Sequence, residues 1–362
     1  MKILITGNMG YIGPVVTANL RQAYPNAYLI GYDMGYFAAS LTHPSFLPEN
    51  QLDQQIFGDV RTFDPTVLAG VDKVIYLAAI SNDAMGNRYE SVTYDINYKA
   101  AIQIAKQAKM AGASSFVFAS SCSMYGKADD AAKTEQSQLN PLTAYAKSKV
   151  NAERDLEPLA SENFNITCLR FATACGMSPR LRLDLVLNDF VAGAVSSGKI
   201  KILSDGSPWR PLIHIKDMAR AINWAINRPG SNGGEFLAVN AGSSKWNYQV
   251  IDLAKAVSQA IQGVQVEINK NAAPDERSYK VNFELFEKLA PDAQPICNLA
   301  DTIQELYDGL IAMEFDNINF HNSPFMRLRI LNSLQEKSHL DETLNWTFRP
   351  SVKKNNESIL AF

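Results

Sequence analysis

Short apolar runs alternate with longer stretches of helical periodicity through the first half of the chain. Strands are predicted over five apolar runs, at residues 3–5, 28–32, 71–79, 115–120 and 165–171. Helices are predicted after the first, third and fourth of these runs, ending near residue 22 and covering about 97–111 and 145–160. Apolar strands that alternate with helices are typical of βαβ units. The pattern therefore predicts an α/β fold whose parallel sheet is covered by helices on both faces.

The pattern changes after residue 176, where the apolar runs become shorter and less regular. Residues 177–210 are predicted to be helical and then loop-like, and they precede short strands and a helix near 213–215, 236–240 and 248–262. We divide the chain into three parts. Residues 1–176 form a sheet domain, residues 177–211 and 241–300 form a smaller α/β lobe, and residues 301–362 form a mostly helical extension. The strands near 212–217 and 236–240 are expected to return to the sheet domain.

Composition and charge narrow the possible functions. The chain has 362 residues, with 34 Lys plus Arg and 37 Asp plus Glu, so no basic excess is present to neutralise a nucleic-acid backbone. Its four cysteines form no CxxC pair and its four histidines are scattered, so no disulfide framework or metal site is expected. No apolar run reaches the roughly eighteen residues of a membrane helix, and the first apolar stretch is too short for a signal peptide. These features predict a cytoplasmic protein without a membrane or nucleic-acid partner.

A glycine-rich loop follows the first predicted strand. Gly7, Gly10 and Gly13 have the spacing GxxGxxG and stand between that strand and the next helix. Glycines at this place let the backbone approach a pyrophosphate, which then lies at the helix N-terminus. Asp33 ends the second strand, twenty residues after Gly13, where a carboxylate holds the adenosine ribose. No Arg or Lys follows Asp33 closely enough to take a 2′-phosphate, which favours NAD over NADP.

A second constellation lies further along the chain. Tyr145 and Lys149 form a YxxxK pair, and residues four apart share one face of a helix. A Lys ammonium near a phenol lowers the phenol pKa, so such a Tyr can remove a proton from a sugar hydroxyl while hydride leaves the carbon. The serines at 120, 121 and 123 follow a strand and offer a hydroxyl to the same oxygen. Each of these motifs also has a purely structural interpretation. The glycine loop can be a turn with a surface Asp, the YxxxK pair a helix with a solvated Lys, and the serine run a turn that ends a strand.

Taken in order, these motifs resemble extended short-chain dehydrogenase/reductases of the NAD-dependent nucleotide-sugar epimerase/dehydratase family. The resemblance rests on the glycine loop, Asp33, the strand end at 77–79, Asn97, the serine run and YxxxK, and covers roughly residues 1–300. It implies a Rossmann-type doubly wound parallel sheet that binds NAD, with a smaller C-terminal α/β lobe that binds a nucleoside-diphosphate sugar. It also implies a homodimer formed by the helices near 97–111 and 145–160.

The resemblance assigns roles to individual positions. Tyr145 is the acid/base, Lys149 its partner, and the hydroxyl four residues before Tyr125 is Ser121, with Ser123 as second choice. The residues implied for NAD binding are Gly7, Gly10, Tyr11, Ile12, Gly13, Asp33, Asp59, Val60, Leu77, Ala78, Ala79, Asn97, Tyr145 and Lys149. The residues implied for substrate binding are Ser121, Ser123, Tyr145, Asn188, Arg210 and Arg277. His214 and Asp217 are expected to brace the segment that carries Arg210.

Departures from the family pattern narrow the reaction. Family 4,6-dehydratases carry an acidic pair after the catalytic hydroxyl residue, whereas this chain has Cys122 and Ser123. Neither side chain can serve as a carboxylate base. Cys122 is also offset by one residue from the position at which the 3,5-epimerases of this group carry a Cys, and it is expected to be buried. C4 epimerisation of a nucleoside-diphosphate sugar through a transient 4-keto intermediate is therefore favoured. A net dehydrogenase, reductase or dehydratase on a nucleotide sugar, and a non-catalytic nicotinamide-binding regulator, remain alternatives. The stretch at 320–346 extends past the usual core, and either packing on the lobe or binding a partner is open.

Overall fold

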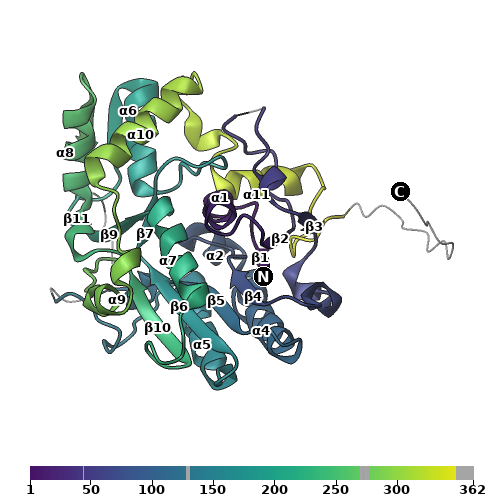
Figure 1. The fold of residues 1–362 in the computed structure, drawn as a ribbon. Helices are drawn as coiled ribbons and strands as arrows, with labels where there is room; N and C mark the ends of the chain where they lie inside the picture. Colours follow the sequence, from purple (N-terminus) through teal and green to yellow (C-terminus); the bar gives the residue numbers. More distant parts are fainter. Residues whose placement is uncertain (44, 128–130, 270–271, 273–276, 348–362) are drawn as a thin grey trace.

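A seven-stranded parallel sheet forms the centre of the protein (Figure 1). The computed structural model describes residues 1–43, 45–127, 131–269, 272 and 277–347. In spatial order the strands are β10 (Phe236–Ala241), β6 (Asn165–Phe171), β5 (Ser115–Ser121), β4 (Lys73–Tyr76), β1 (Lys2–Thr6), β2 (Tyr28–Asp33) and β3 (Gln54–Phe57). The predicted doubly wound sheet is confirmed, and the strand order reverses between β1 and β4. Ligands bind in such sheets outside the carboxyl ends of the strands at that reversal.

Successive side chains of the inner strands of the sheet enter two different cores. Ile3 and Ile5 of β1 belong to one core, and Leu4 between them belongs to the other. Because neighbouring side chains point to opposite faces, a strand that is apolar throughout is buried on both. Helices cover each face: α1 (Gly13–Ala23) and α7 (Ile215–Asn227) lie on one, and α4 (Ala101–Met110) and α5 (Ala144–Leu156) lie on the other.

The helix predicted over 97–111 starts earlier than expected and is not uniform. It is preceded by α2 (Asp83–Arg88) and begins with α3 (Glu90–Tyr94), which passes through a π-helical turn at Asp95–Ala100 into α4. A π turn inserts one residue into the helix and is frequent near functional sites. Here it carries Asn97, whose side chain points at the loop after β4.

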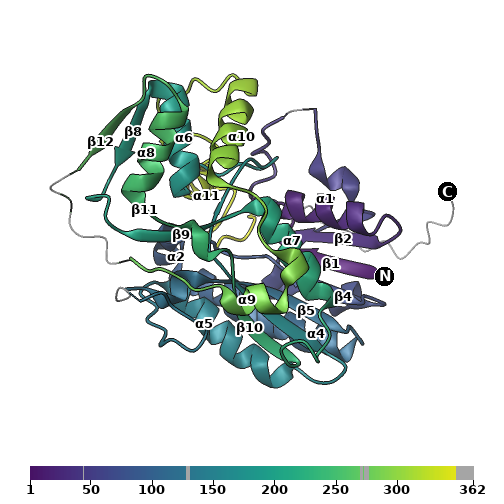
Figure 2. The same cartoon turned by 60° about the vertical axis from the view of Figure 1, so that its left-hand side comes forward.

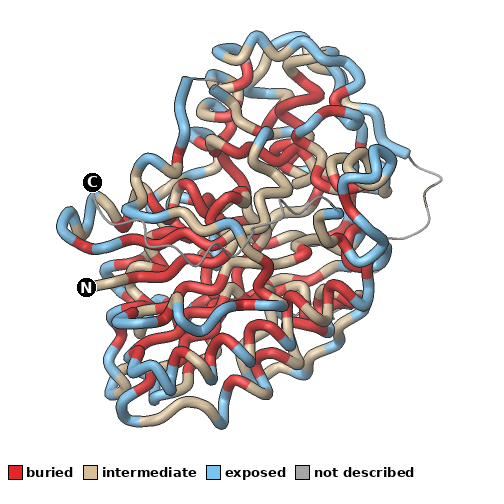
Figure 3. The backbone as a smooth tube through the Cα atoms, turned by 90° about the vertical axis from the view of Figure 1, so that its right-hand side faces the viewer, coloured by how far each residue is buried: buried red, intermediate tan, exposed pale blue. Residues whose placement is uncertain are grey.

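The smaller lobe gathers at one end of the molecule (Figures 1 and 2). Its helices α6 (Val186–Ser197), α8 (Val250–Ala260) and α10 (Leu299–Ala312) pack on one another, and α9 (Glu284–Leu289) lies against β10. It contains a parallel pair, β8 (Lys199–Ile202) with β12 (Gln265–Ile268), and a sheet of β7 (Thr173–Cys175), β9 (Trp209–His214) and β11 (Asn247–Gln249). Figure 3 shows buried residues in the sheet domain and in the smaller lobe. The core that contains Ile3 and Ile5 continues into the smaller lobe.

Two predicted boundaries differ from the structure. A strand near 212–217 was expected to rejoin the large sheet, but β9 pairs with β7 and β11, and only β10 rejoins it. Helix α7 returns instead, because the apolar residues after His214 follow the helical repeat, as Met218, Ile222 and Ala225 show. The lobe also runs beyond residue 300, since Leu306 of α10 lies in its core.

The C-terminal extension crosses back to the sheet domain. A short 3₁₀ turn (Phe320–Asn322) leads into α11 (Arg327–Glu336), which lies beside α2. Leu331, Leu340 and Leu344 are buried in the second core, on the sheet domain side. Phe320 and Phe325 belong to the first core, which continues into the lobe, so the stretch packs on the lobe as well as on the sheet domain. No helix in the described part of the chain has the length and apolarity needed to span a membrane.

Candidate active site

The loop between β1 and α1 can be built only from glycine at two positions. Gly7 has a φ of 75°, and a Cβ there would lie 2.5 Å from the backbone nitrogen of Ala78. A Cβ on Gly13 would lie 2.1 Å from the carbonyl oxygen of Asn8. The loop thus packs backbone to backbone against the end of β4, and the N-terminus of α1 is left open to an adjoining cavity. That cavity has about 900 Å³ of empty space, part of it open to solvent.

The cavity lies where the strand order reverses, and it collects most of the residues predicted to bind NAD. Those that line it are Gly7, Gly10, Tyr11, Ile12, Gly13, Asp33, Asp59, Val60, Leu77, Ala78 and Ala79. Asn97, Tyr145 and Lys149 do not line it. Further lining residues that the motifs did not indicate are Tyr32, Met34, Tyr36, Phe37, Gly58, Ile80, Ser81, Met85, Ile96, Arg182 and Arg327.

Asp33 is held in place by backbone amides. Met9 donates to its Oδ2 at 3.0 Å, and Gly35 donates to its Oδ1 at 2.8 Å. Desolvation raises the pKa of Asp33, although both amides act in the opposite direction. Arg180 also lowers it, but that guanidinium is already paired with Glu49 at 2.7 Å. Asp33 therefore presents a fixed acceptor to the cavity, which suits a ribose diol and opposes a 2′-phosphate.

Asn97 supports the wall of the cavity from behind. It is fully buried, and its side-chain oxygen accepts from the Ile80 amide at 2.8 Å while its amide group donates to the Ile80 carbonyl at 3.0 Å. It also donates to the Ser148 hydroxyl at 3.2 Å. Asn97, which lies in the π turn, thus fixes the loop after β4 against α5.

Tyr145, Lys149 and the serines meet at the carboxyl end of β5. Tyr145 is hydrogen-bonded to Ser121, and the Ser121 hydroxyl lies 2.9 Å from that of Ser123. Desolvation raises the pKa of Tyr145, whereas the bond to Ser121 and the charge of Arg182 lower it. Lys149 donates to the Ala119 carbonyl at 2.6 Å, and its ammonium lies 5.7 Å from the centroid of the Tyr145 ring.

Lys149 is almost completely buried, with 2% of its surface exposed. Burial lowers its pKa to about 7, although the nearby Cys168 and Glu153 act in the opposite direction. A lysine in this state holds or releases a proton near neutral pH, which suits a partner of a catalytic phenol.

A buried ion pair lies next to the serines at the end of β5. Arg170 pairs with Glu153 at 2.7 Å, and Glu153 accepts from the Ser120 hydroxyl at 2.5 Å. The Cys122 thiol is fully buried and lies 3.0 Å from the Arg170 carbonyl. Burial raises the pKa of Cys122 far above its usual range. The prediction that Cys122 is buried is confirmed, and its thiol is not available as an acid/base.

The two arginines predicted to bind the substrate diphosphate lie together. Arg210 on β9 donates to the carbonyl of Arg277. Arg277 pairs with Asp83 at 2.9 Å, and Asp83 accepts from the Thr143 hydroxyl at 2.7 Å. Thr143 caps α5 by accepting from the amide of Ala146. This chain of contacts brings both arginines to the start of the helix that carries Tyr145.

Asn188 lies elsewhere from these arginines and is fully buried. Its side-chain oxygen accepts from the Gly176 amide at 3.1 Å, and its amide group donates to the Tyr11 hydroxyl at 2.9 Å and to the Arg182 carbonyl at 2.9 Å. All of these partners belong to the chain itself. Asn188 thus positions Tyr11 of the glycine loop and the segment that carries Arg182.

His214 and Asp217 have structural contacts at the start of α7, His214 at the end of the strand that carries Arg210 and Asp217 with a later segment of the chain. The Nδ1 atom of His214 accepts from the Lys216 amide at 3.0 Å and caps α7. Asp217 is buried and accepts from the amides of Ile296 and Cys297 at 3.0 and 3.2 Å. Across the described residues, no group of three or more His, Cys, Asp or Glu side chains is arranged to hold a metal ion.

Comparison with known proteins places this geometry in a family. A sequence model of the NAD dependent epimerase/dehydratase family matches residues 3–242. The chain belongs to this family. The predicted family, the NAD-dependent enzyme class and the cofactor are thereby confirmed. The match ends one residue after β10, so α8 to α11 lie outside it.

The sequence identity to individual curated proteins and solved structures is low. The uncharacterized UDP-glucose epimerase YtcB of Bacillus subtilis (strain 168) is 29% identical over 239 residues, which cover 63% of this chain and 73% of YtcB. The UDP-glucose 4-epimerase of Pasteurella multocida (strain Pm70) is 25% identical over 292 residues, covering 71% and 81%. The structure of MoeE5 in complex with UDP-glucose and NAD shares the fold, with a TM-score of 0.73 and 22% identity over 86% of this chain and 99% of MoeE5.

The residues that line the cavity fit NAD. The backbone cradle at Gly7 and Gly13 excludes any side chain, so the loop backbone at the N-terminus of α1 can come close to a pyrophosphate. Asp33 supplies the ribose acceptor at the end of β2. Leu77, Ala78 and Ala79 give a smooth wall at the end of β4. Helix α2 lies between the cavity and α5, because Met85 lines the cavity and a Cβ on the neighbouring Gly86 would lie 3.2 Å from the Cβ of Tyr145.

Proposed function

We propose that this protein interconverts the C4 epimers of a nucleoside-diphosphate sugar through a transient 4-keto sugar. The observation that carries the proposal is the hydrogen-bonded pair of Tyr145 and Ser121, with the buried Lys149 beside it. This group lies next to the glycine-cradled cavity, because α5, which carries Tyr145, packs against α2, and Met85 of α2 lines the cavity. YtcB and the Pasteurella enzyme, which are named as UDP-glucose epimerases, support the choice of reaction.

The side chains divide the chemistry of proton transfer. Tyr145 takes the proton from the C4 hydroxyl, and Ser121 hydrogen-bonds to the same oxygen and holds it in line. When bound, NAD supplies the reversible hydride acceptor that oxidises C4 and reduces it again. Lys149 holds the nicotinamide ribose and, when charged, favours the phenolate of Tyr145. In the second half-reaction Tyr145 returns the proton, so that the enzyme ends in its starting protonation state.

Inversion at C4 requires the keto sugar to turn over between the two half-reactions. The nucleoside diphosphate must stay anchored during this movement. We assign that role to Arg210 and Arg277, which lie together at the start of α5 and offer charge-assisted hydrogen bonds to a pyrophosphate. Asp83 pairs with Arg277 and would be displaced by the diphosphate. Asn188 contributes by positioning Tyr11 rather than through direct contact.

Dehydration is disfavoured by the residues that follow Ser121. Elimination of water from the keto sugar needs a base for the C5 proton. The side chains at the two positions after Ser121 are the thiol of Cys122, which is buried against Arg170, and the hydroxyl of Ser123. Neither acts as a carboxylate base. A net dehydrogenase or reductase remains the second candidate, because the same Tyr145, Ser121 and Lys149 would serve it.

We further propose a homodimer in the cytoplasm, working in carbohydrate biosynthesis. The face made by α4 and α5 suits a four-helix interface between two copies. All four cysteines of the chain are described, and all are free thiols, which suits a reducing compartment. Sedimentation at micromolar concentration should therefore give twice the mass of the 40.0 kDa chain.

The deciding experiment is turnover without added cofactor. The purified holoenzyme is incubated with UDP-glucose or UDP-galactose, and the sugars are separated by chromatography. We expect the two to interconvert while no free NADH accumulates, because an epimerase returns its hydride in every cycle. If added NAD is instead consumed in proportion to the sugar and NADH appears in solution, the dehydrogenase candidate replaces the epimerase. Binding of NAD without any turnover would indicate the regulatory alternative.

A further inference from the structure

Arg327 reaches the dinucleotide cavity from outside the part of the chain that matches the family. It begins α11, lines the cavity and is only 1% exposed. Its guanidinium carbon lies 4.4 Å from the centroid of the Phe37 ring, and its Nη2 donates to the Arg180 carbonyl at 2.7 Å. Its other terminal nitrogen, Nη1, is buried and has no hydrogen-bond partner among the described residues.

The surroundings of Arg327 do not neutralise its charge. Arg182 lines the same cavity, but its guanidinium is occupied by Asp184 at 2.9 Å and by the Ser81 hydroxyl at 2.8 Å. Burial lowers the pKa of Arg327 to about 9, and the nearby Arg182 lowers it further, although Asp184 acts in the opposite direction. A buried cation with an unsatisfied donor is costly, so its presence points to an anion that is bound there during function.

We propose that Arg327 binds the pyrophosphate of the dinucleotide, so that the C-terminal segment forms one wall of the cofactor site. The glycine loop and the N-terminus of α1 face the same cavity and already favour an anion. The guanidinium of Arg327 supplies the charge that this loop lacks, because no basic side chain lies between Gly7 and Gly13. The proposal rests on the proposed NAD-dependent function.

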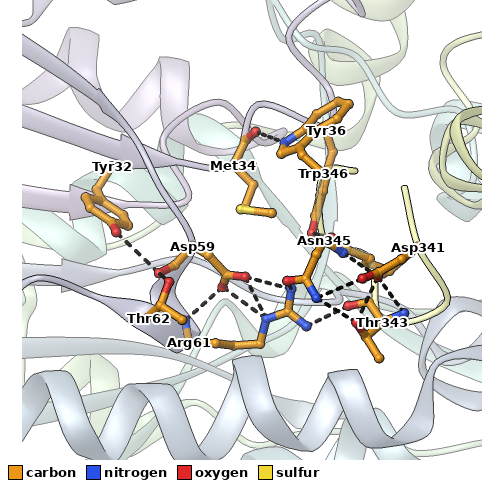
Figure 4. Close-up of polar contacts among 11 residues, drawn as sticks. Tyr32, Met34, Tyr36, Asp59, Arg61, Thr62, Asp341, Thr343, Asn345 and Trp346 are labelled. Atoms are coloured by element: carbon orange, nitrogen blue, oxygen red, sulfur yellow. Dashed lines mark hydrogen bonds and ion pairs between the residues drawn. The ribbon is translucent and has the colours of Figure 1, made fainter. Parts of the chain in front are cut away.

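The chain beyond α11 holds this wall in place at the adenosine end of the cavity (Figure 4). Arg61, which is paired with Asp59 of the cavity lining at 2.6 Å, donates to the Thr343 carbonyl at 2.6 Å and to the side-chain oxygen of Asn345 at 2.9 Å. The Trp346 indole donates to the Met34 carbonyl at 2.8 Å.

Two further contacts fix the same turn. The Tyr36 hydroxyl donates to the Leu344 carbonyl. Asp341 accepts from the amides of Thr343 and Asn345, each at 2.8 Å. Met34, Tyr36 and Asp59 all line the cavity, so residues 341–346 are tied to its lining at several points. A segment held in this way would slow the release of a bound dinucleotide, which an epimerase needs to retain through both half-reactions.

The test replaces the charge and compares ligands with and without phosphate. Arg327→Gln is compared with Arg329→Gln, an exposed arginine on the same helix, in cofactor-stripped protein. Calorimetry then measures the binding of NAD, ADP and adenosine. We expect Arg327→Gln to weaken NAD and ADP by about ten- to hundredfold and to leave adenosine within about threefold. Arg329→Gln should bind all three as the wild type does.

Other outcomes overturn the inference. Unchanged ADP binding in Arg327→Gln would show that the guanidinium does not meet the pyrophosphate. An equal loss for adenosine and ADP would show that Arg327 only shapes the wall. Arg327→Lys keeps the charge and should recover part of the ADP affinity, and this variant serves if Arg327→Gln fails to fold. Failure of the wild type to bind NAD would contradict the proposed function itself, whereas normal NAD binding and turnover with an unaffected Arg327→Gln would contradict only this inference.

The closing turn has its own readout, the rate at which NAD dissociates. Asn345→Ala removes one contact to Arg61, and Glu342→Ala changes an exposed neighbour in the same turn. We expect Asn345→Ala to speed NAD release severalfold and Glu342→Ala to leave it unchanged. Equal release rates in the two variants and the wild type would mean that this turn does not retain the cofactor.

Discussion

The dinucleotide side of the site is built largely from backbone, and the substrate side largely from long charged side chains. The former is a cradle at Gly7 and Gly13 with a wall from the end of β4, and most of it is buried. The latter depends on Arg210 and Arg277, of which Arg277 is exposed and paired with Asp83. A backbone cradle accepts one kind of ligand, whereas side chains can be changed singly to select another. The family can therefore be recognised from the first region, whereas the proposed diphosphate contacts of the second region depend on single side chains.

The substitution Tyr145→Phe should separate the two regions most clearly, because it should affect turnover and leave NAD binding unchanged. It should lower kcat by about 10²- to 10⁴-fold, because the positioned acid/base is lost. NAD binding should not change, since Tyr145 does not line the dinucleotide cavity. Tyr24→Phe serves as the control, because it also removes a hydrogen-bonded hydroxyl, here one that contacts Asn223 outside the cavity. A comparable loss in both variants, measured as epimer interconversion, would show that Tyr145 does not act in proton transfer.

The sequence pattern locates the strands of the large sheet well, because burial on both faces leaves uniformly apolar runs such as 3–5 and 115–120. It does not locate β3, because an edge strand with the sequence Gln54–Phe57 contains few apolar residues. Helix α7 is amphipathic, yet it follows the strand at 209–214 without a break that separates the two. The small sheets of the lobe are too short to leave a clear pattern.

Gly7→Ala tests whether the cradle is set by backbone contact. It should destabilise the protein by about 1–3 kcal/mol more than Gly70→Ala. Both glycines have positive φ, at 75° and 69°, so both variants bear the same backbone strain. Only at position 7 does the new Cβ meet backbone, 2.5 Å from the Ala78 nitrogen, whereas position 70 has open space. Equal losses in urea unfolding would mean that the loop can move away and that the cradle is not rigid.

Arg210→Gln addresses the substrate side. It should raise KM for the nucleoside-diphosphate sugar by about tenfold or more, because a charge-assisted contact to the diphosphate is lost. The affinity for NAD should stay the same. Arg220→Gln is the matched control, since its guanidinium contacts the Asp292 carbonyl on the outer side of α7. A parallel loss of NAD affinity in Arg210→Gln would show that the two regions are coupled rather than separate.

The motifs of the site could be predicted because each is local in sequence. The glycine loop and the YxxxK pair need only a strand, a turn and one helical turn to bring their members together. Arg182 and Arg327 reach the same cavity from different elements, and no spacing in the chain connects them. Only the folded structure shows that these two buried guanidinium groups lie near the same glycine loop. Asn188 resembles a ligand by position, yet the fold uses its amide internally.

Lys149 lies between the two regions, and the effect predicted for it is a change of stability with pH. Burial lowers its pKa to about 7, whereas an unfolded lysine has its ordinary value near 10.4. Below pH 7 Lys149 is charged in both the folded and the unfolded state. The folded state then bears the whole desolvation cost of the buried ammonium, which lowers the free energy of unfolding. Between about pH 7 and pH 10 the folded state has released the proton and the unfolded state has kept it. Stability attributable to Lys149 therefore rises with pH across this range.

Lys149→Met removes that dependence. In the cofactor-stripped protein the variant should be more stable than the wild type near pH 6, and the gap in the free energy of urea unfolding should close as the pH approaches 10. Lys147→Met, an exposed lysine on the same helix, should show no such trend. A gap that stays constant from pH 6 to 10 would mean that Lys149 keeps its charge inside the protein. The charged ammonium would then lie beside Tyr145 before any ligand binds. It would lower the pKa of the phenol even in the absence of substrate.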